Sequence, residues 1–226
     1  MRRERQMQID QLFQLMKDGT LETLYMVIVS TIIAYVIGIP TGVILFITDK
    51  NGISENSIVN KIVGVIVNLL RSVPFIILLV AILPFTRALV GTTIGSTATI
   101  VPLVVAAAPF VARMVESSLK EVDAGIIEAA QAMGSSNWQI ITKVLLPEAK
   151  PSLIVGSTIA VTTILGYSAM AGFVGGGGLG AIAINYGYYR YQTNVMLVTV
   201  VLLVIVVQIF QEAGMKIAGK SDKRTR

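Results

Sequence analysis

The spacing of the charged residues constrains this chain more than any other feature. Residues 23–48, 88–112 and 151–189 carry no charged side chain, which leaves uncharged intervals of 26, 25 and 39 residues between short charged stretches. A helix needs about 20 apolar residues to cross a membrane, because each residue adds about 1.5 Å toward about 30 Å of hydrocarbon. The layout therefore predicts membrane-spanning helices rather than a soluble core.

The apolar blocks predict an all-α polytopic membrane protein with about five transmembrane helices in a single domain. The predicted spans are residues 21–48, 58–83, 97–116, 151–172 and 192–211. A loop at 121–147 and a glycine-rich loop at 172–190 connect the last three spans, and we expect the second loop to be flexible and external. In the first span, Gly38 and Gly42 form a G-x-x-x-G pattern that lets a neighbouring helix approach closely.

The segment before the first span carries apolar residues at helical spacing. Ile9, Leu12, Phe13 and Met16 fall on one helical face, which predicts a short helix lying on the membrane surface. For orientation, residues 48–61, 113–150 and the C-terminal tail carry 11 lysines and arginines, against six on the opposite side. The positive-inside rule then places the C-terminus in the cytoplasm and the N-terminus outside, although the N-terminal arginines favour the reverse.

The composition excludes several kinds of chemistry. The chain contains no cysteine and no histidine, which excludes disulfide frameworks, thiol or imidazole catalysis and the usual zinc sites. We therefore expect no catalytic residue, metal or cofactor in this chain. The net charge of +5 comes from lysines and arginines that flank apolar blocks, so we expect no nucleic-acid partner.

Two glycine motifs match nucleotide-binding patterns only formally. Residues 214–221 read G-M-K-I-A-G-K-S, like a phosphate-binding loop, and Gly175, Gly177 and Gly180 satisfy G-x-G-x-x-G. Each motif binds nucleotides only between a strand and a helix, and neither stands in that context here. If the chain works with ATP, the nucleotide site lies on another polypeptide.

The stretch between the third and fourth spans predicts a helical hairpin. Asp123 is placed to cap a first helix that runs to about Met133, and Gly134 is placed to end it in a left-handed conformation. Ser136 and Gln139 are spaced as a capping box for a second helix. Apolar stripes are expected on both helices: Ile126, Ile127, Ala130 and Met133 on the first, and Trp138, Ile141 and Leu145 on the second. Pro147 either ends the second helix or opens the next one.

Residue identities in this hairpin resemble a known signature. The pattern of Glu128, Ala129, Ala130 and Gly134, followed by V-L-L-P at 144–147, resembles the E-A-A signature of ABC importer permeases and departs from it only at Val144. From periodicity alone, an interfacial connector with no partner explains the hairpin equally well. The resemblance implies a coupling helix in a groove of a cytoplasmic ATPase subunit, with contacts from Glu128, Ala129, Ala130, Gly134, Leu146 and Pro147.

The resemblance extends over nearly the whole chain. R-S-V-P-F-I-I-L-L at 71–79, A-A-P-F-V-A-R-M-V-E at 107–116 and L-G-Y-S-A-M-A-G at 165–172 resemble the methionine-importer permease (MetI) family. The family implies a non-enzymatic subunit of the bacterial cytoplasmic membrane that moves D- or L-methionine as a homodimer. It also implies two MetN-like ATPase subunits that carry ATP and Mg, and a MetQ-like lipoprotein that delivers the substrate.

Several residues are candidates for the transport path and for docking. Tyr167, Ser168 and Met170 are expected to line the path, with ordinary helix packing as the alternative. Arg71 interrupts the second span. It is a candidate for a role in the transport path or in pairing of the subunits, and the alternative is that its side chain snorkels to the membrane surface. The residues expected to dock a binding protein are Gly175, Gly176, Gly177, Gly178, Tyr186 and Tyr188, although a membrane-interface aromatic belt explains the tyrosines nearly as well.

Other functions remain open at this point. A secondary transporter or channel would work without an ATPase, but the uncharged interiors of the spans offer no carboxylate for ion coupling. A membrane assembly protein would bind an ATPase without moving solute. Within the favoured class, a permease for another amino acid or a small osmolyte is the closest alternative, because the binding protein sets much of the specificity.

Overall fold

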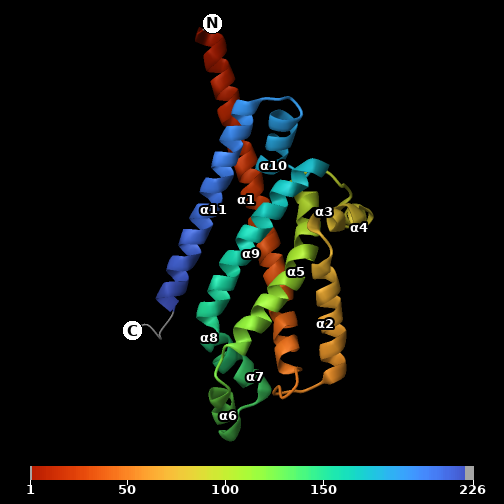
Figure 1. The fold of residues 1–226 in the computed structure, drawn as a ribbon, viewed down its shortest axis with the longest axis vertical. Coiled ribbons are helices and arrows are strands. Elements are labelled where there is room, and N and C mark those ends of the chain that lie inside the picture. Colours follow the sequence, from red (N-terminus) through yellow and green to blue (C-terminus); the bar gives the residue numbers. More distant parts are fainter. Residues whose placement is uncertain (1, 222–226) are drawn as a thin grey trace. The chain divides into compact units, whose positions relative to one another are not determined.

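A computed structural model of the chain describes the backbone of residues 2–221 and the side chains of residues 10–221. The described residues are mostly helical and contain no strand (Figure 1). Within this described part, four helices are long and apolar enough to cross a membrane, and a bent helix pair supplies a fifth crossing if it is one span. The protein is therefore an all-α polytopic membrane protein. The basic residues Lys223, Arg224 and Arg226 lie outside the described part.

Contacts within the chain divide it into two compact units. Unit 1 comprises the chain up to Thr31, Pro74–Val104 and Val161–Phe210. Unit 2 comprises Ile32–Val73, Val105–Ala160 and the chain from Gln211 onward. The candidate coupling hairpin belongs to unit 2, and the glycine-rich segment belongs to unit 1.

The first helix, α1 (Arg2–Ile47), is longer than the predicted span and overturns the prediction of a separate surface helix. Residues 17–22 contain no proline, so nothing in the backbone separates the N-terminal residues from the span. Met16 is buried against Leu179 and Ile182 within unit 1, whereas Phe13 is 70% exposed. The two residues therefore do not share one membrane-facing stripe, and the side chain of Ile9 lies outside the described part.

The predicted second span is broken into two helices. α2 (Ser57–Ser72) ends before an extended Val73, and α3 (Phe75–Ala81) begins after Pro74. Proline disfavours helical conformation in the preceding residue and lacks the N–H that would continue the helical ladder, which accounts for the break. A further short helix, α4 (Leu83–Val90), follows.

In unit 2, α1 packs closely on α5 (Ser96–Lys120) through two glycines. A Cβ atom on Gly38 would lie 2.5 Å from Val111 Cγ1, and one on Gly42 would lie 2.5 Å from the carbonyl oxygen of Ala112. This contact confirms the close approach predicted from the G-x-x-x-G pattern. Leu45, Val67 and Ala112 form a buried apolar cluster beside it, so α1, α2 and α5 pack together.

The glycine-rich segment of unit 1 is packed rather than flexible, which overturns that prediction. α9 (Lys150–Ala171) continues into the 3-10 turn η2 (Gly172–Val174), the short helix α10 (Gly178–Ile182) and the π-helical η3 (Ala183–Tyr188). The last long helix, α11 (Thr193–Ser221), follows. The backbone N–H of Gly178 donates to Glu22 Oε2 at 2.7 Å, and that of Leu179 donates to Thr23 Oγ1 at 2.8 Å. Both acceptors belong to α1, so its side chains hold the start of α10.

Candidate functional site

The first arm of the hairpin forms as its local sequence predicts. α6 (Ala124–Ala132) is capped by Asp123, whose carboxylate accepts a hydrogen bond of 2.7 Å from the backbone N–H of Gly125. Gly134 has φ of +79°, a left-handed conformation that glycine adopts without the cost imposed by a Cβ atom. The cap and the helix end predicted from the sequence are both confirmed.

The second arm begins with the predicted capping box. In α7 (Asn137–Gln139), the Ser136 side chain accepts from the backbone N–H of Gln139, and Gln139 Oε1 accepts from the backbone N–H of Ser136 at 2.9 Å. The chain then widens into the π-helical segment η1 (Ile140–Leu145) before α8 (Leu146–Glu148). Pro147 lies in the first turn of α8, so it opens that helix, which was one of the two predicted alternatives.

Burial separates an inner and an outer face of the hairpin. Ala130, Ile140 and Leu145 are buried, and α6 packs against η1. Met133 is 78% exposed and Trp138 is 72% exposed. Of the residues expected in the two apolar stripes, only Ala130 and Leu145 are buried. The wider turn of η1 shifts the residues that follow it relative to ordinary helical spacing, so the sequence pattern missed Ile140.

The residues of the E-A-A pattern lie mostly on the outer face. Glu128, Ala129, Gly134 and Pro147 are exposed, Leu146 is partly buried, and Ala130 is buried between the arms. The hairpin therefore exposes two large apolar side chains, Met133 and Trp138, on the same short stretch of chain as the exposed Glu128. Exposed apolar surface of this kind is typical of a protein interface.

A network of charged residues on α5 was not foreseen from the sequence. Glu116 is buried, and its carboxylate accepts hydrogen bonds from Arg113 Nη1 at 2.5 Å and Lys120 Nζ at 2.8 Å. Lys120 Nζ also lies 3.0 Å from Asp49 Oδ2, and Arg113 Nη2 donates to Asn68 Oδ1 at 2.9 Å. The hydrogen bond from Lys120, together with the backbone N–H of Lys50, holds the pKa of Asp49 below its ordinary value.

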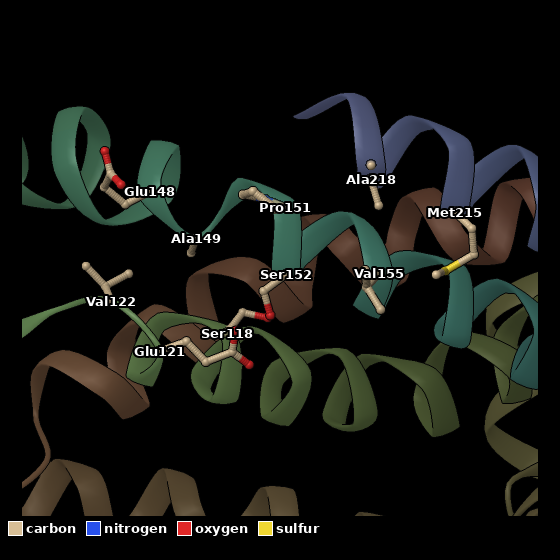
Figure 2. A pocket seen from close by; sticks show the side chains of 11 residues that line it. Ser118, Glu121, Val122, Glu148, Ala149, Pro151, Ser152, Val155, Met215 and Ala218 are labelled. Atoms are coloured by element: carbon tan, nitrogen blue, oxygen red, sulfur yellow. The ribbon is translucent and has the colours of Figure 1, made fainter. Parts of the chain in front are cut away.

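A cavity of about 510 Å³ lies at the base of the hairpin in unit 2. Figure 2 shows walls formed by the end of α5, the start of α9 and the end of α11. Ser152 Oγ donates to Ser118 Oγ at 3.0 Å, while Glu121 and Glu148 supply carboxylates and Met215 supplies an apolar surface. The two acidic residues stand immediately before and after the hairpin.

The candidate path residues occupy different environments. In unit 1, the ring of Tyr167 stacks on Phe75, with centroids 4.4 Å apart and planes within 4°. Met170 is 48% exposed. Ser168 is buried, and its hydroxyl donates to the carbonyl of Leu165 at 2.8 Å, so it offers no surface to a solute. In unit 2, Arg71 is exposed in the last turn of α2, where the C-terminal end of the helix dipole favours a cation.

The candidate docking residues separate into packed glycines and exposed tyrosines. Gly176 and Gly178 are buried, and Gly175 and Gly177 are partly buried in the same turn. Tyr188 is 59% exposed, and the ring of Tyr186 lies 4.5 Å beneath the guanidinium of Arg190. Sequence reasoning missed Tyr191, which is 88% exposed and has φ of +55°, an uncommon conformation for a bulky residue.

The formal nucleotide motif at Gly214–Ser221 does not form a loop. These residues lie within α11, and Gly214 packs against Thr158 of α9. A continuous helix keeps its amide groups in its own hydrogen bonds, so they cannot surround a phosphate. Among the side chains of residues 10–221, no group of three or more acidic residues is placed to hold a metal ion.

Comparison with known proteins identifies the family. The model of the family described as "Binding-protein-dependent transport system inner membrane component" matches residues 34–214. The probable D-methionine transport system permease protein MetI of Vibrio cholerae is 52% identical over 210 residues, which cover 93% of each chain. The D-methionine transport system permease protein MetI of Escherichia coli strain K12 is 54% identical over 154 residues, which cover 68% of this chain and 71% of that protein.

Solved structures agree with these relatives. A chain of the MetNI methionine ABC transporter, in an inward-facing conformation, superimposes with a TM-score of 0.92 at 51% identity, covering 93% of this chain and 97% of that one. A chain of an amino acid ABC transporter solved with histidines gives a TM-score of 0.79 at 16% identity, covering 95% of this chain and 97% of that one, which shows the fold alone. The resemblance found in the sequence is therefore confirmed, and this chain belongs to the inner-membrane components of binding-protein-dependent ABC importers, within the MetI permease family.

Proposed function

We propose that this chain is the permease subunit of an ATP-driven methionine importer. The observation that carries this proposal is the hairpin of residues 123–147, whose capped arms present Met133 and Trp138 outward beside the E-A-A residues. The relatives with about half of their residues identical are named as D-methionine permeases, which favours methionine over other amino acids and osmolytes.

The hairpin is proposed to attach to a cytoplasmic ATPase subunit. Glu128, Ala129 and Gly134 offer one charge and little bulk, so a partner groove can close over Met133 and Trp138. This role requires the hairpin and the C-terminus to face the cytoplasm, with the N-terminus outside, as the count of lysines and arginines favours. Two permease chains and two MetN-like ATPases, which carry ATP and Mg, would complete the energised assembly.

The path for methionine is proposed to pass the stacked pair of Phe75 and Tyr167. The stack stands beside the break at Pro74, and Met170 is exposed one turn further along α9. Flat aromatic surfaces and a thioether give weak contacts that a passing methionine side chain can make and leave. Arg71, at the end of α2, remains a candidate either for this path or for pairing of the two permease chains.

A MetQ-like binding protein is proposed to dock on the exposed tyrosines of unit 1. Tyr188 and Tyr191 offer large rigid rings with polar tips, which are common at protein interfaces. The buried glycines of the same segment hold the turn in shape rather than touching a partner. The tyrosines therefore carry the proposed contact, and Gly175 and Gly177 shape the turn of the same segment.

Reconstitution tests the proposal directly. The chain is placed in lipid vesicles with its ATPase and binding protein, and uptake of D- and L-methionine is followed with and without ATP. We expect uptake that requires all three proteins, and hydrolysis that methionine stimulates more than other amino acids or osmolytes do. Uptake by the permease alone would instead identify a secondary transporter, and ATPase binding without solute flux would identify an assembly protein.

A further inference from the structure

The charged network in unit 2 ties three separate segments of the chain together. Glu116 of α5 accepts from both Arg113 and Lys120. Arg113 reaches α2, where Nη2 donates to Asn68 Oδ1 at 2.9 Å and approaches the carbonyl oxygen of Gly64 at 3.4 Å. Lys120 reaches the turn after α1, where Asp49 Oδ2 lies 3.0 Å away. One buried carboxylate thus holds the two cations that bind the neighbouring segments.

The turn after α1 also touches the hairpin. Asn137 Nδ2, at the start of the second hairpin arm, donates to the carbonyl oxygen of Ile53 at 3.4 Å. Two backbone hydrogen bonds hold this turn to the end of α1: the N–H of Ser54 donates to the carbonyl oxygen of Ile47 at 3.0 Å, and that of Asn56 donates to the carbonyl oxygen of Thr48 at 3.1 Å. A continuous set of contacts therefore runs from the hairpin through this turn to Lys120 and Glu116.

The other end of the network contacts α2. Arg113 is the charged residue of α5 that binds α2, and its own position depends on the 2.5 Å hydrogen bond to Glu116. If Glu116 lost its charge, no carboxylate charge would stand between the two cations Arg113 and Lys120. Arg113 would then lose its ionic partner. The apolar cluster of Leu45, Val67 and Ala112 would still hold the helices together. Loss of the charge should therefore loosen the linkage without unfolding the unit.

We infer that Glu116 is a positioning residue for transport. By holding Arg113 and Lys120, it makes α2 move together with the hairpin when the ATPase closes. This inference rests on the proposed function, because it requires an ATPase to act on the hairpin. In the sequence, α2 leads directly into the break at Pro74, after which the half-helix α3 begins. Glu116 acts through Arg113 and Lys120 and does not itself touch the solute.

The test uses the complete transporter in lipid vesicles with Glu116→Gln in the permease. We expect normal assembly and ATP hydrolysis within about twofold of wild type, but at least a tenfold fall in methionine imported per ATP hydrolysed. The matched control is Glu212→Gln, which removes an exposed carboxylate of α11 that pairs with Lys216 at 3.3 Å on the same helix, and it should leave this ratio unchanged. An unchanged ratio in Glu116→Gln overturns the inference.

A double variant separates positioning from stability. Replacing a buried ion pair by apolar residues often preserves stability, so Arg113→Met with Glu116→Leu should unfold at or above the wild-type temperature. The inference requires this double variant to import as little methionine per ATP as Glu116→Gln does. Recovery of the ratio together with stability would show that the network only stabilises the fold.

A spectroscopic measurement follows the movement itself. The chain has no cysteine, so spin labels can be attached to Leu69→Cys on α2 and Gln131→Cys on α6 alone. Two permease chains would carry four labels, so the labelled chain is diluted with unlabelled permease until the distance within one chain dominates. We expect that distance to have one narrow distribution with and without ATP in the otherwise wild-type chain, and a broadened one in Glu116→Gln. Equal widths in the two proteins would contradict the inference. If the wild-type chain fails to bind an ATPase or to import any solute, the proposed function fails instead.

Discussion

Gly42 of α1 and Ala112 of α5 cross so closely that a Cβ atom on the glycine would lie 2.5 Å from the alanine carbonyl oxygen. That oxygen is backbone, so it cannot turn aside as the end of a side chain can. We predict that Gly42→Val destabilises the folded protein by about 1–3 kcal/mol, the usual cost of overpacking a core. Thermal unfolding in detergent measures the change.

Gly166→Ala is the matched control, because nothing lies within 4 Å of a Cβ atom there and alanine favours helix. Equal stability of the two variants would show that the helices do not pack this closely.

Trp138→Ala should weaken attachment of the ATPase. Trp138 is 72% exposed on the outer face of the hairpin, and truncating an aromatic residue at the centre of an interface commonly costs about 2 kcal/mol or more. We expect affinity for the ATPase to fall about thirtyfold, as measured by titration in detergent. Ile217→Ala, at an exposed apolar position on α11, should leave the affinity unchanged. Full affinity in Trp138→Ala would place the interface elsewhere.

Ser136→Ala should loosen the hairpin without affecting the spans. The variant loses the side chain that caps α7, a change that typically costs about 1 kcal/mol of helix stability. Hydrogen exchange followed by mass spectrometry should show faster exchange across residues 136–146. Ser135→Ala serves as the control, because the Ser135 hydroxyl makes no hydrogen bond within the described part of the chain. Faster exchange throughout the protein would argue against a local cap.

The contact of Asp49 with Lys120 should make stability depend on pH in the acid range. The pKa of Asp49 lies below its ordinary value of 3.8, so the carboxylate stabilises the folded protein above that value and loses this contribution as the pH falls through its lowered pKa. Asp49→Asn should therefore be less stable than wild type at pH 7, by no more than about 1 kcal/mol because the pair is partly exposed. The difference in melting temperature should stay constant from pH 7 to about pH 4 and shrink as the pH is lowered further below the ordinary pKa of 3.8. A difference that stayed constant below that value would show that charge is not the cause.

Local chemistry allowed the hairpin to be predicted almost residue by residue. Asp123, Gly134 and Ser136 each satisfy backbone groups within a few residues of themselves, so their roles depend little on the rest of the fold. The Gly38 and Gly42 contact was foreseen for a similar reason, because closely spaced glycines leave a groove whichever helix fills it.

Features that depend on distant partners were harder to predict. Glu116 and Arg113 looked like ordinary charges at the end of a span, and only the packing of α2 and the turn after α1 shows what they bind. The glycine-rich segment was mistaken for a flexible loop, because glycine is common both in mobile chain and where backbones touch. Composition alone cannot separate these two uses.

The packed glycine turn has a genetic consequence. Every amino acid other than glycine carries a Cβ atom, and at Gly176 and Gly178 that atom would lie less than 3 Å from Thr99 Oγ1 and Thr23 Oγ1, respectively. Any amino-acid substitution at these two positions, even glycine to alanine, therefore places a Cβ atom too close to its neighbours. A random-mutagenesis screen can select cells that no longer grow on the transported nutrient. Loss-of-function substitutions should accumulate in residues 172–180. Substitutions at Gly166 and Gly219, which have open space around them, should be absent from such cells.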